Sequence, residues 1–232
     1  MIVKRLLLAA SVLTLLSGAS FAADLAPQAV EPVAPAYAPY SWTGFYVGLN
    51  AGGAWNDSKW SPVAGVTSFP SFNTNGSGFI YGAQAGYNYQ INQFVVGLEG
   101  DFSGSTVKGD GSCAGTAARC ETKQDWLASI RGRVGYAFDR LLIYGTGGVA
   151  FTQYKNRETS PISVSWGDST RTGWTVGLGA EYAITDHITA GVEWKYYDFG
   201  DKNENANPVI NPSAIKFKET EHTVIGKINY KF

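Results

Sequence analysis

The last twelve residues of the chain, EHTVIGKINYKF (Glu221–Phe232), alternate between two kinds of side chain. One set is apolar and becomes aromatic toward the end: Val224, Gly226, Ile228, Tyr230 and Phe232. The other set is mostly polar and contains lysine: Thr223, Ile225, Lys227, Asn229 and Lys231. A period of two residues predicts a β-strand whose two faces meet different environments. The fold therefore depends on which environment each face meets.

The N-terminus has the three parts of a secretory signal peptide. Lys4 and Arg5 form a basic region, the apolar stretch LLLAASVLTLL follows at Leu6–Leu16, and Ser20–Ala22 provides a cleavage site. The apolar stretch is shorter than the about 20 residues that a membrane-spanning helix needs. We therefore predict that residues 1–22 are a signal peptide cleaved after Ala22, rather than a buried helix.

The composition excludes some classes of function. Charged residues make up only 16% of the chain, below the about 25% of ordinary soluble domains, while aromatic residues make up 14%. The formal net charge is -1, and removal of the two cations of the signal peptide takes it to -3. No basic patch stands out, so we do not expect the protein to bind nucleic acid.

A segment rich in alanine and proline, DLAPQAVEPVAPAYAPY, occupies Asp24–Tyr40. Proline cannot donate a hydrogen bond to a strand ladder, and sequence of this kind favours extended conformations. We interpret residues 23–41 as a periplasmic linker, with an interaction arm as the alternative. Residues 42–232 are then expected to form one barrel domain.

From Trp42 onward, alternation with a period of two recurs in eight segments. The predicted strands are Gly44–Trp55, Gly78–Tyr89, Phe94–Gly104, Gln124–Phe138, Leu141–Thr152, Gly173–Ile184, Ile188–Phe199 and Glu221–Phe232. Leu142 breaks the pattern because it has the wrong parity. Short turns at Gln90–Gln93, Asp139–Arg140 and Thr185–His187 alternate with long polar segments at 56–77, 105–123, 153–172 and 200–217. This alternation of lengths is typical of outer-membrane barrels.

Aromatic residues of the apolar parity collect at both ends of the predicted strands. One rim receives Phe45, Tyr87, Tyr89, Phe94, Tyr136, Phe138, Tyr182, Tyr230 and Phe232, and the other receives Trp55, Phe79, Tyr81, Phe102, Trp126, Phe151, Trp174, Trp194 and Tyr196. Two aromatic girdles around an uncharged apolar band indicate a surface that faces lipid. We predict an all-β, eight-stranded antiparallel up-and-down transmembrane β-barrel with short periplasmic turns and long extracellular loops. A soluble lipocalin-like barrel would turn its apolar face inward.

Three stretches resemble a known family: SWTGFYVGLNAG at Ser41–Gly52, IYGTGGVAF at Ile143–Phe151, and the aromatic strand that ends at Phe232. From Trp42 onward the chain resembles the outer-membrane immunogenic proteins of alpha-proteobacteria, which are small opacity-type and OmpA-like eight-stranded barrels. The resemblance implies that the strand ending in Tyr230 and Phe232 is the signal read by the barrel-assembly machinery. Some members of this family are described as haemin-binding or porin-like surface proteins.

Charged residues of the polar parity are predicted to face the barrel interior. Acids and bases are equal in number: Glu99, Asp101, Glu181 and Glu193, and Arg131, Arg133, Lys195 and Lys227. An eight-stranded barrel is only wide enough for its own side chains, so these charges must pair or lose hydration without compensation. We predict an ion-pair and hydrogen-bond plug, completed by Tyr46, Asn50, Gln84 and Asn88. A gated ion path through the same network is the alternative.

The cysteines and histidines offer few other candidate sites. Cys113 and Cys120 are close in sequence, and in an exported chain they are predicted to form a disulfide in an outer loop rather than a metal site. His187 falls in a short turn and His222 lies near the outer end, and neither has the serine partner that hydrolysis would need. We expect no catalytic residue, cofactor or metal. His222 as a haem ligand follows only from the resemblance.

These observations predict a structural, surface-exposed protein of the Gram-negative outer membrane with a periplasmic N-terminus. It would support envelope integrity and present loops at the cell surface, and the alternative is a porin-like barrel or one that binds haemin or another small ligand. Its expected partners are outer-membrane lipids and, during assembly, the barrel-assembly machinery and periplasmic chaperones. Contact with a host or with haemin would occur through the loops.

Overall fold

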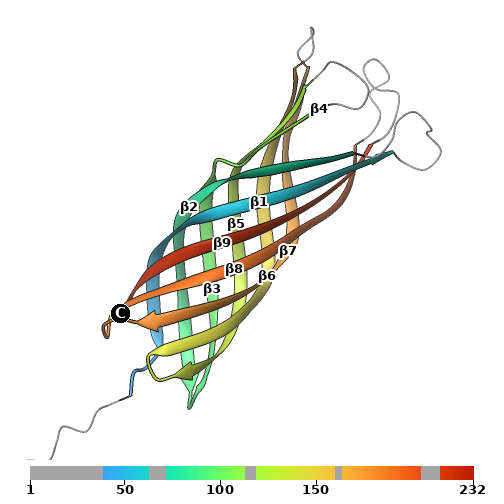
Figure 1. The fold of residues 1–232 in the computed structure, drawn as a ribbon. Coiled ribbons are helices and arrows are strands. Elements are labelled where there is room, and N and C mark those ends of the chain that lie inside the picture. Colours follow the sequence, from blue (N-terminus) through green and yellow to red (C-terminus); the bar gives the residue numbers. More distant parts are fainter. Residues whose placement is uncertain (1–38, 63–71, 113–118, 160–163, 205–214) are drawn as a thin grey trace, which may run out of the picture. The chain divides into compact units, whose positions relative to one another are not determined.

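Long β-strands account for almost all of the described chain, and each one runs antiparallel to its neighbours (Figure 1). The computed structural model describes residues 39–62, 72–112, 119–159, 164–204 and 215–232. The strands are β1 Gly44–Pro62, β2 Phe72–Ile91, β3 Phe94–Ser105, β4 Lys108–Ser112, β5 Arg119–Phe138, β6 Leu141–Thr159, β7 Val164–Ala183, β8 Ile188–Glu204 and β9 Ile215–Lys231. None of the described residues lies in a helix long and apolar enough to cross a membrane.

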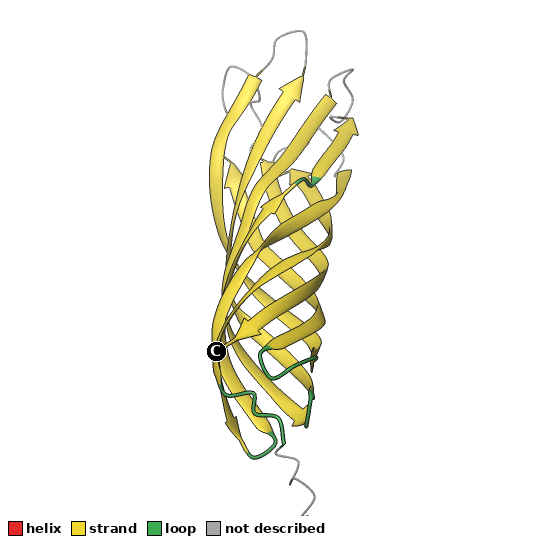
Figure 2. Ribbon diagram, turned by 90° about the vertical axis from the view of Figure 1, so that its left-hand side faces the viewer, coloured by secondary structure: helices red, strands yellow, loops and turns green. Residues whose placement is uncertain are grey.

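The sheet closes on itself because β1 pairs with both β2 and β9 (Figure 2). The short strand β4 adds no position to the barrel, since it pairs with β2 and β5, the same neighbours as β3. The barrel therefore has eight strand positions, and the predicted eight-stranded antiparallel fold is confirmed.

The interruption between β3 and β4 is bridged by hydrogen bonds. The backbone nitrogen of Thr106 donates to the carbonyl oxygen of Phe79 over 2.9 Å, and the Thr106 hydroxyl accepts from the Phe79 nitrogen at the same distance. On the other side, the nitrogen of Gln124 donates to the carbonyl of Val107 over 3.2 Å. The wall therefore continues past the break without leaving these backbone groups unpaired.

One end of the barrel, called here the short-turn end, has the turns Asn92–Gln93, Asp139–Arg140 and 184–187. Asn92 and Asp139 both have a φ of 54°, which the short polar side chains of these residue types tolerate better than most. These turns lie where the sequence predicted them. The opposite end, called here the loop end, is the end at which β1, β4, β6 and β8 finish and β2, β5, β7 and β9 begin.

The strands extend farther toward the loop end than the sequence predicted. β1 continues from Trp55 to Pro62, and β2 begins at Phe72 instead of Gly78. The expected loops 56–77, 105–123, 153–172 and 200–217 were therefore too long. In this extension both faces are polar, with Asn56 buried and Asp57 exposed, so the ladder continues after the alternation of hydrophobicity has ended.

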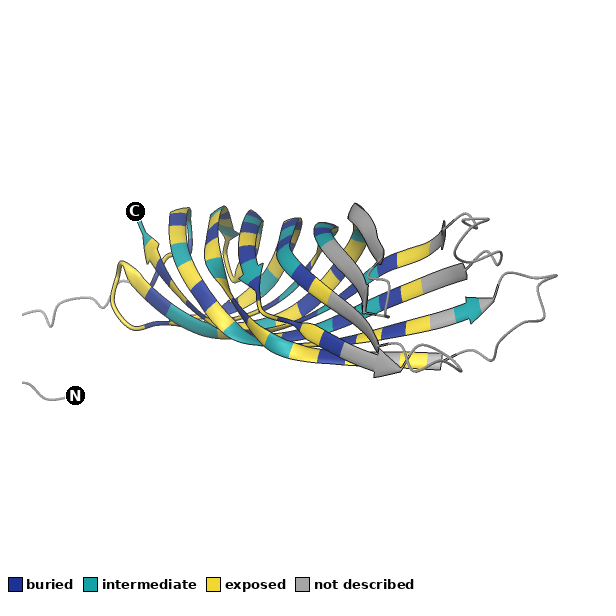
Figure 3. Cartoon of the chain, turned by 90° about the horizontal axis from the view of Figure 1, so that it is seen from above, coloured by how far each residue is buried: buried dark blue, intermediate teal, exposed yellow. Residues whose placement is uncertain are grey.

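Exposure alternates residue by residue along the wall, as Figure 3 shows. Apolar residues such as Leu49, Leu98 and Leu178 are exposed by 65%, 66% and 64% on the outer surface. The aromatic residues predicted for the two girdles also lie on the outer surface; Phe45 and Tyr136 mark one rim, and Phe79 and Trp174 the other. The apolar parity therefore faces outward, opposite to the arrangement in a lipocalin-like barrel.

Candidate functional site: the barrel interior

Arg131 is the centre of a buried ion-pair network inside the barrel. Its guanidinium lies 2.5 Å from a Glu99 carboxylate oxygen and 2.8 Å from Asp101, and it also contacts Glu193. Glu99 and Arg131 face each other directly on β3 and β5, so the register of the ladder brings them together. One cation thus offsets part of the desolvation cost of three buried carboxylates.

Arg133 and Lys227 extend this network toward the short-turn end. Arg133 lies 2.5 Å from Glu181 and 3.8 Å from Glu99, and its guanidinium carbon is 3.8 Å from the centre of the Tyr144 ring. The Lys227 ammonium lies 3.0 Å from Glu99 and 3.9 Å from Glu181. It also lies 3.5 Å from Glu193, so each of the two cations is shared among carboxylates from different strands.

Lys195 completes the set of eight predicted interior charges, with its ammonium 3.6 Å from Asp101. All eight side chains are buried, and the four acids balance the four bases. The structure therefore brings together every charged residue that the sequence assigned to the interior. Because buried charges are stable only when paired, the network fixes the positions of the strands that supply them.

A chain of amide groups lies beside the ion pairs. Asn50 donates to Gln84 over 2.6 Å, Gln84 donates to Asn229 over 2.6 Å, and Asn229 donates to Glu181 over 2.8 Å. The Tyr46 hydroxyl donates to Glu99 over 2.7 Å. Asn88, the fourth predicted member, is buried, but its side-chain oxygen has no hydrogen-bond partner among the described residues.

Glycine leaves the space that the larger interior side chains fill. A Cβ atom at Gly86 would come within 2.5 Å of the Tyr46 Cζ atom, and one at Gly179 would come within 2.5 Å of the Tyr144 hydroxyl. Both glycines face inward on the polar parity. The interior is therefore closely packed, as expected for a barrel of this size.

A second polar cluster lies nearer the loop end and was not predicted. Arg171 lies 3.2 Å from Glu219, and the Gln124 amide donates to Glu221 over 2.7 Å and to Thr152 over 3.0 Å. Arg171 fell within the segment 153–172 that the sequence assigned to a loop, and Glu219 lies just before the predicted strand Glu221–Phe232. The alternation could have predicted the inward position of Glu219 and Glu221, because both lie an even number of residues before the inward-facing Lys227.

Clusters of buried apolar residues lie on both sides of the ion pairs. Toward the loop end lie two clusters of buried residues: Ala54, Ile80, Val107 and Ile225, and Leu127, Ala150, Tyr197 and Phe199. At the short-turn end lies a third cluster: Tyr40, Trp42, Val95, Ala137, Leu142, Tyr144 and Ala183. Leu142, whose parity had been unexplained, faces inward and belongs to this third cluster. Side chains therefore fill the interior on both sides of the ion-pair network.

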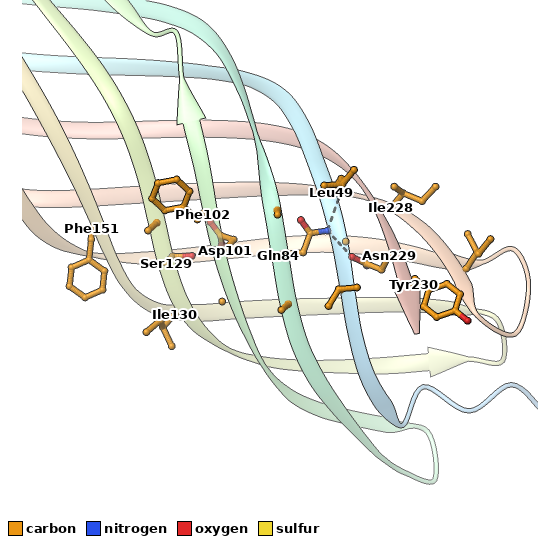
Figure 4. Close-up of a pocket in the computed structure, with 17 residues that line it drawn as sticks. Leu49, Gln84, Asp101, Phe102, Ser129, Ile130, Phe151, Ile228, Asn229 and Tyr230 are labelled. Atoms are coloured by element: carbon orange, nitrogen blue, oxygen red, sulfur yellow. Dashed lines mark hydrogen bonds between the residues drawn. The ribbon is translucent and has the colours of Figure 1, made fainter. Parts of the chain in front are cut away.

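The outer wall carries a groove of about 960 Å³ (Figure 4). Bulky apolar side chains border it on two sides, with Phe102, Ile130 and Phe151 on one and Leu49, Ile228 and Tyr230 on the other. The polar residues along it belong to the interior: Gln84, Asp101, Ser129 and Asn229 are buried and bonded there. The groove therefore offers mainly apolar contact, as lipid chains require, and the Tyr230 hydroxyl is the polar group that its outward-facing lining carries.

The histidines and the C-terminal residues lie outside this network. His187 contacts the carbonyl oxygen of Lys231 through Nδ1 over 2.9 Å and stacks on Tyr230, while His222 lies 5.0 Å from the Tyr196 ring and 5.9 Å from the Trp194 ring. Tyr230 and Phe232 are on the outer surface, and the Phe232 nitrogen donates to the Phe45 carbonyl over 3.0 Å.

The predicted disulfide falls outside the described part of the structure. Cys113 is not among the described residues. Cys120 belongs to β5, and its backbone lies opposite Gly111 in the ladder. The Cys113–Cys120 bridge therefore stays a prediction.

Comparison with known proteins places this barrel in a family. Residues 29–219 match the family described as "Outer membrane protein beta-barrel domain". The chain belongs to this outer-membrane β-barrel family. It is 38% identical to the 31 kDa outer-membrane immunogenic protein of Brucella melitensis biotype 1, covering 96% of this chain and 98% of the relative. The resemblance seen in the sequence is therefore confirmed, and the outer membrane is the family's location.

Two further comparisons extend this picture. The chain is 34% identical to a 22 kDa outer membrane protein of Rhizobium leguminosarum bv. viciae, over 74% of this chain and 70% of the relative. The solved structure of the outer membrane protein OprG from Pseudomonas aeruginosa is similar with a TM-score of 0.51 and 16% identity, covering 82% of this chain and 96% of that one. At that identity the similarity concerns the fold alone.

Proposed function

We propose that this protein is a structural, surface-exposed outer-membrane barrel that supports the envelope and presents loops at the cell surface. The observation that supports the proposal is the filled interior, in which a charge-balanced ion-pair network lies between clusters of buried apolar residues. Such an interior ties strands together but leaves no lumen for transport. The names of the relatives, which describe immunogenic outer-membrane proteins, agree with exposure at the surface.

The proposed orientation places the short-turn end in the periplasm and the loop end outside. Short periplasmic turns and longer extracellular loops are the usual arrangement of such barrels. The extended wall at the loop end has polar residues on both faces, with Asn56 and Ser58 inside and Asp57 and Lys59 outside, as a wall surrounded by water requires. This rigid extension would raise the loops above the lipid surface.

Lipids and assembly factors are the partners that this proposal implies. The outward aromatic and aliphatic surface is suited to outer-membrane lipid. Tyr230 and Phe232, which close β9 against β1 and project outward, are proposed as the signal read by the barrel-assembly machinery after delivery by periplasmic chaperones. The proposed role includes no catalysis: the described contacts of the His187 and His222 rings are with a backbone carbonyl and with aromatic rings.

A surface barrel that binds haemin or another flat ligand is the second candidate, and one observation favours it. His222 lies among Trp194 and Tyr196 on the outer surface, and it faces Trp55 in the ladder. An imidazole among aromatic rings could hold a planar ligand. A porin-like function is less well supported, because the interior residues occupy the path that a solute would take.

Two measurements test the proposed role. Purified protein in planar lipid bilayers should give rare, small openings, whereas steady openings of about a nanosiemens would overturn the closed barrel in favour of a pore. A strain lacking the protein should become more sensitive to detergents and bile salts, and the wild-type chain should restore resistance. Unchanged sensitivity of the deletion strain would contradict a role in envelope integrity.

A further inference from the structure

The residues just before β1 contribute to the filling of the barrel, although they are not part of its wall. Trp42 is only 1% exposed and packs in the apolar cluster at the short-turn end, which also includes Val95, Leu142 and Ala183. These three neighbours come from β3, β6 and β7. The segment 40–43, called here the strap, therefore reaches across the opening from β1 to the opposite side.

Four hydrogen bonds hold the strap to two other parts of the barrel. The Trp42 backbone nitrogen donates to the Gln90 side chain over 2.8 Å, and the Gln90 nitrogen donates to the Thr43 hydroxyl over 3.0 Å. The Trp42 indole donates to the carbonyl of Asp139 over 3.0 Å, and the Tyr40 nitrogen donates to the Asp139 carboxylate over 2.9 Å. None of these bonds belongs to the ladder between strands.

Cations at the rim hold Tyr40 in place. The Lys231 ammonium lies 4.3 Å from the centre of the Tyr40 ring and also contacts the Ser41 carbonyl, while the Arg140 guanidinium carbon lies 5.5 Å from the same ring. Tyr40 in turn meets Trp42 edge-on, with ring centres 5.0 Å apart. These contacts hold the strap at the rim, and the Trp42 side chain extends from it into the buried apolar cluster.

Within the strap and in the strands near it, several polar atoms are buried without a hydrogen-bond partner among the described residues. They are the hydroxyls of Tyr40 and Tyr144, the side-chain oxygen of Asn88 and the Nε of Arg133. Buried polar groups are normally satisfied by protein or by ordered water, and leaving them unsatisfied is costly. The boundary between the strap and the ion network is therefore suited to contact with water.

We propose that the strap is a removable stopper over a polar vestibule at the short-turn end of the barrel. Apart from Val107, which lies in the two-residue break between β3 and β4, the other described residues of the three apolar clusters belong to wall strands and are held by the ladder. The strap can leave by breaking side-chain hydrogen bonds and exposing Trp42, and water would then enter as far as Tyr144 and Arg133. This inference rests on the closed barrel of the proposed function.

The experiment compares two buried alanines on opposite sides of the ion network. Ala183 packs under the strap, and Ala54 lies in an apolar cluster toward the loop end; they are 0% and 1% exposed. Each is replaced by cysteine in a chain that also carries Cys113→Ser and Cys120→Ser. The rate of labelling by a small methanethiosulfonate reagent is measured in detergent micelles, and heat-modifiable electrophoresis verifies that the barrel is folded.

Trp42→Ala should speed the labelling of Ala183→Cys at least about tenfold and leave that of Ala54→Cys unchanged, because only a local opening is made easier. Trp174→Ala, which removes a lipid-facing tryptophan, serves as the matched control and should change neither rate. Equal acceleration of labelling at both cysteines, or no acceleration at Ala183→Cys, would contradict the proposal that the strap is a removable stopper.

A second measurement does not depend on Trp42→Ala folding. The two cysteine variants that retain Trp42 are labelled at urea concentrations below the unfolding transition. The labelling rate of Ala183→Cys should rise less steeply with urea concentration than that of Ala54→Cys. The reason is that departure of the strap exposes less surface than the opening that uncovers Ala54→Cys. Equal dependence on urea would show that the strap leaves only when the barrel unfolds. Channel conductance of the parent tests the closed barrel separately, so the two proposals can fail independently.

Discussion

Arg131 and Glu99 face each other on adjacent strands, and their charged groups lie 2.5 Å apart in the interior of the barrel. Arg131 also contacts Asp101 and Glu193. Arg131→Met would keep most of the side-chain volume but leave these carboxylates without their shared cation. We expect a loss of about 3–5 kcal/mol in the free energy of unfolding, the usual cost of breaking a buried ion pair.

Reversible urea unfolding in lipid vesicles would measure this loss. The matched control is Lys59→Met, which also replaces a cation with methionine, at an exposed position of β1. Its effect should be within about 0.5 kcal/mol, as for most surface substitutions. Equal effects of the two changes would mean that the interior network does not stabilise the barrel.

Val192 tests which surface faces lipid. It is 57% exposed on β8, whereas Lys195 on the same strand is 1% exposed beside Asp101. Val192→Arg should destabilise the folded protein in vesicles by about 2–4 kcal/mol, because a charge enters the apolar part of the bilayer. Val192→Ala, the control, should cost much less. A harmless Val192→Arg together with a severe Val192→Ala would indicate that the outward surface is a packed core.

High pH should weaken the strap through Tyr40. Burial raises the pKa of the Tyr40 hydroxyl from 10.0 to about 12. Because the folded state binds this proton more tightly, the contribution to stability is complete below about pH 10 and is lost as the pH approaches 12. Tyr40→Phe should lose less stability between pH 9 and about 11.5 than the parent, measured by urea unfolding. An equal loss of stability in Tyr40→Phe and in the parent would show that Tyr40 does not contribute to this pH dependence.

The Cys113–Cys120 bridge would close a loop of about eight residues and stabilise the chain by at most about 2–3 kcal/mol. We therefore expect Cys113→Ser to fold, as judged by heat-modifiable electrophoresis. Mass spectrometry after alkylation of unreduced protein from intact cells should find neither cysteine modified. Recovery of two alkylated cysteines would rule out the bridge.

Haemin binding provides a test of the second candidate function. If the aromatic surface around His222 holds the ligand, His222→Ala should abolish the haemin absorbance change seen on titration of the parent. His187→Ala is the control, because His187 lies at the short-turn end against Lys231. Equal binding by the parent and His222→Ala would remove His222 as a ligand.

The membrane-spanning part of the fold was predictable because lipid outside and charge inside impose opposite demands on successive residues. That rule placed the short turns and brought Glu99 and Arg131 to the same side of the wall. It could not predict the strand extension beyond Trp55, where water on both sides removes the contrast. Nor could it explain why Leu142, on the inward parity, is apolar, because the cluster that Leu142 joins includes Trp42, a residue outside the strands. The partners of Lys195 and Arg131 across the barrel depend on closure of the sheet, which no local pattern specifies.

The sharing of each interior cation among several carboxylates affects how this sequence can change over generations. A neutral substitution at Arg131 leaves one excess negative charge in the interior and removes a cation from three carboxylates, so a single second substitution can restore the charge balance but not the three lost contacts. Residues in the network are therefore constrained to change together, whereas an exposed residue such as Lys59 can change alone. Lineages of this barrel would diverge rapidly at the cell surface while retaining the same set of interior charges.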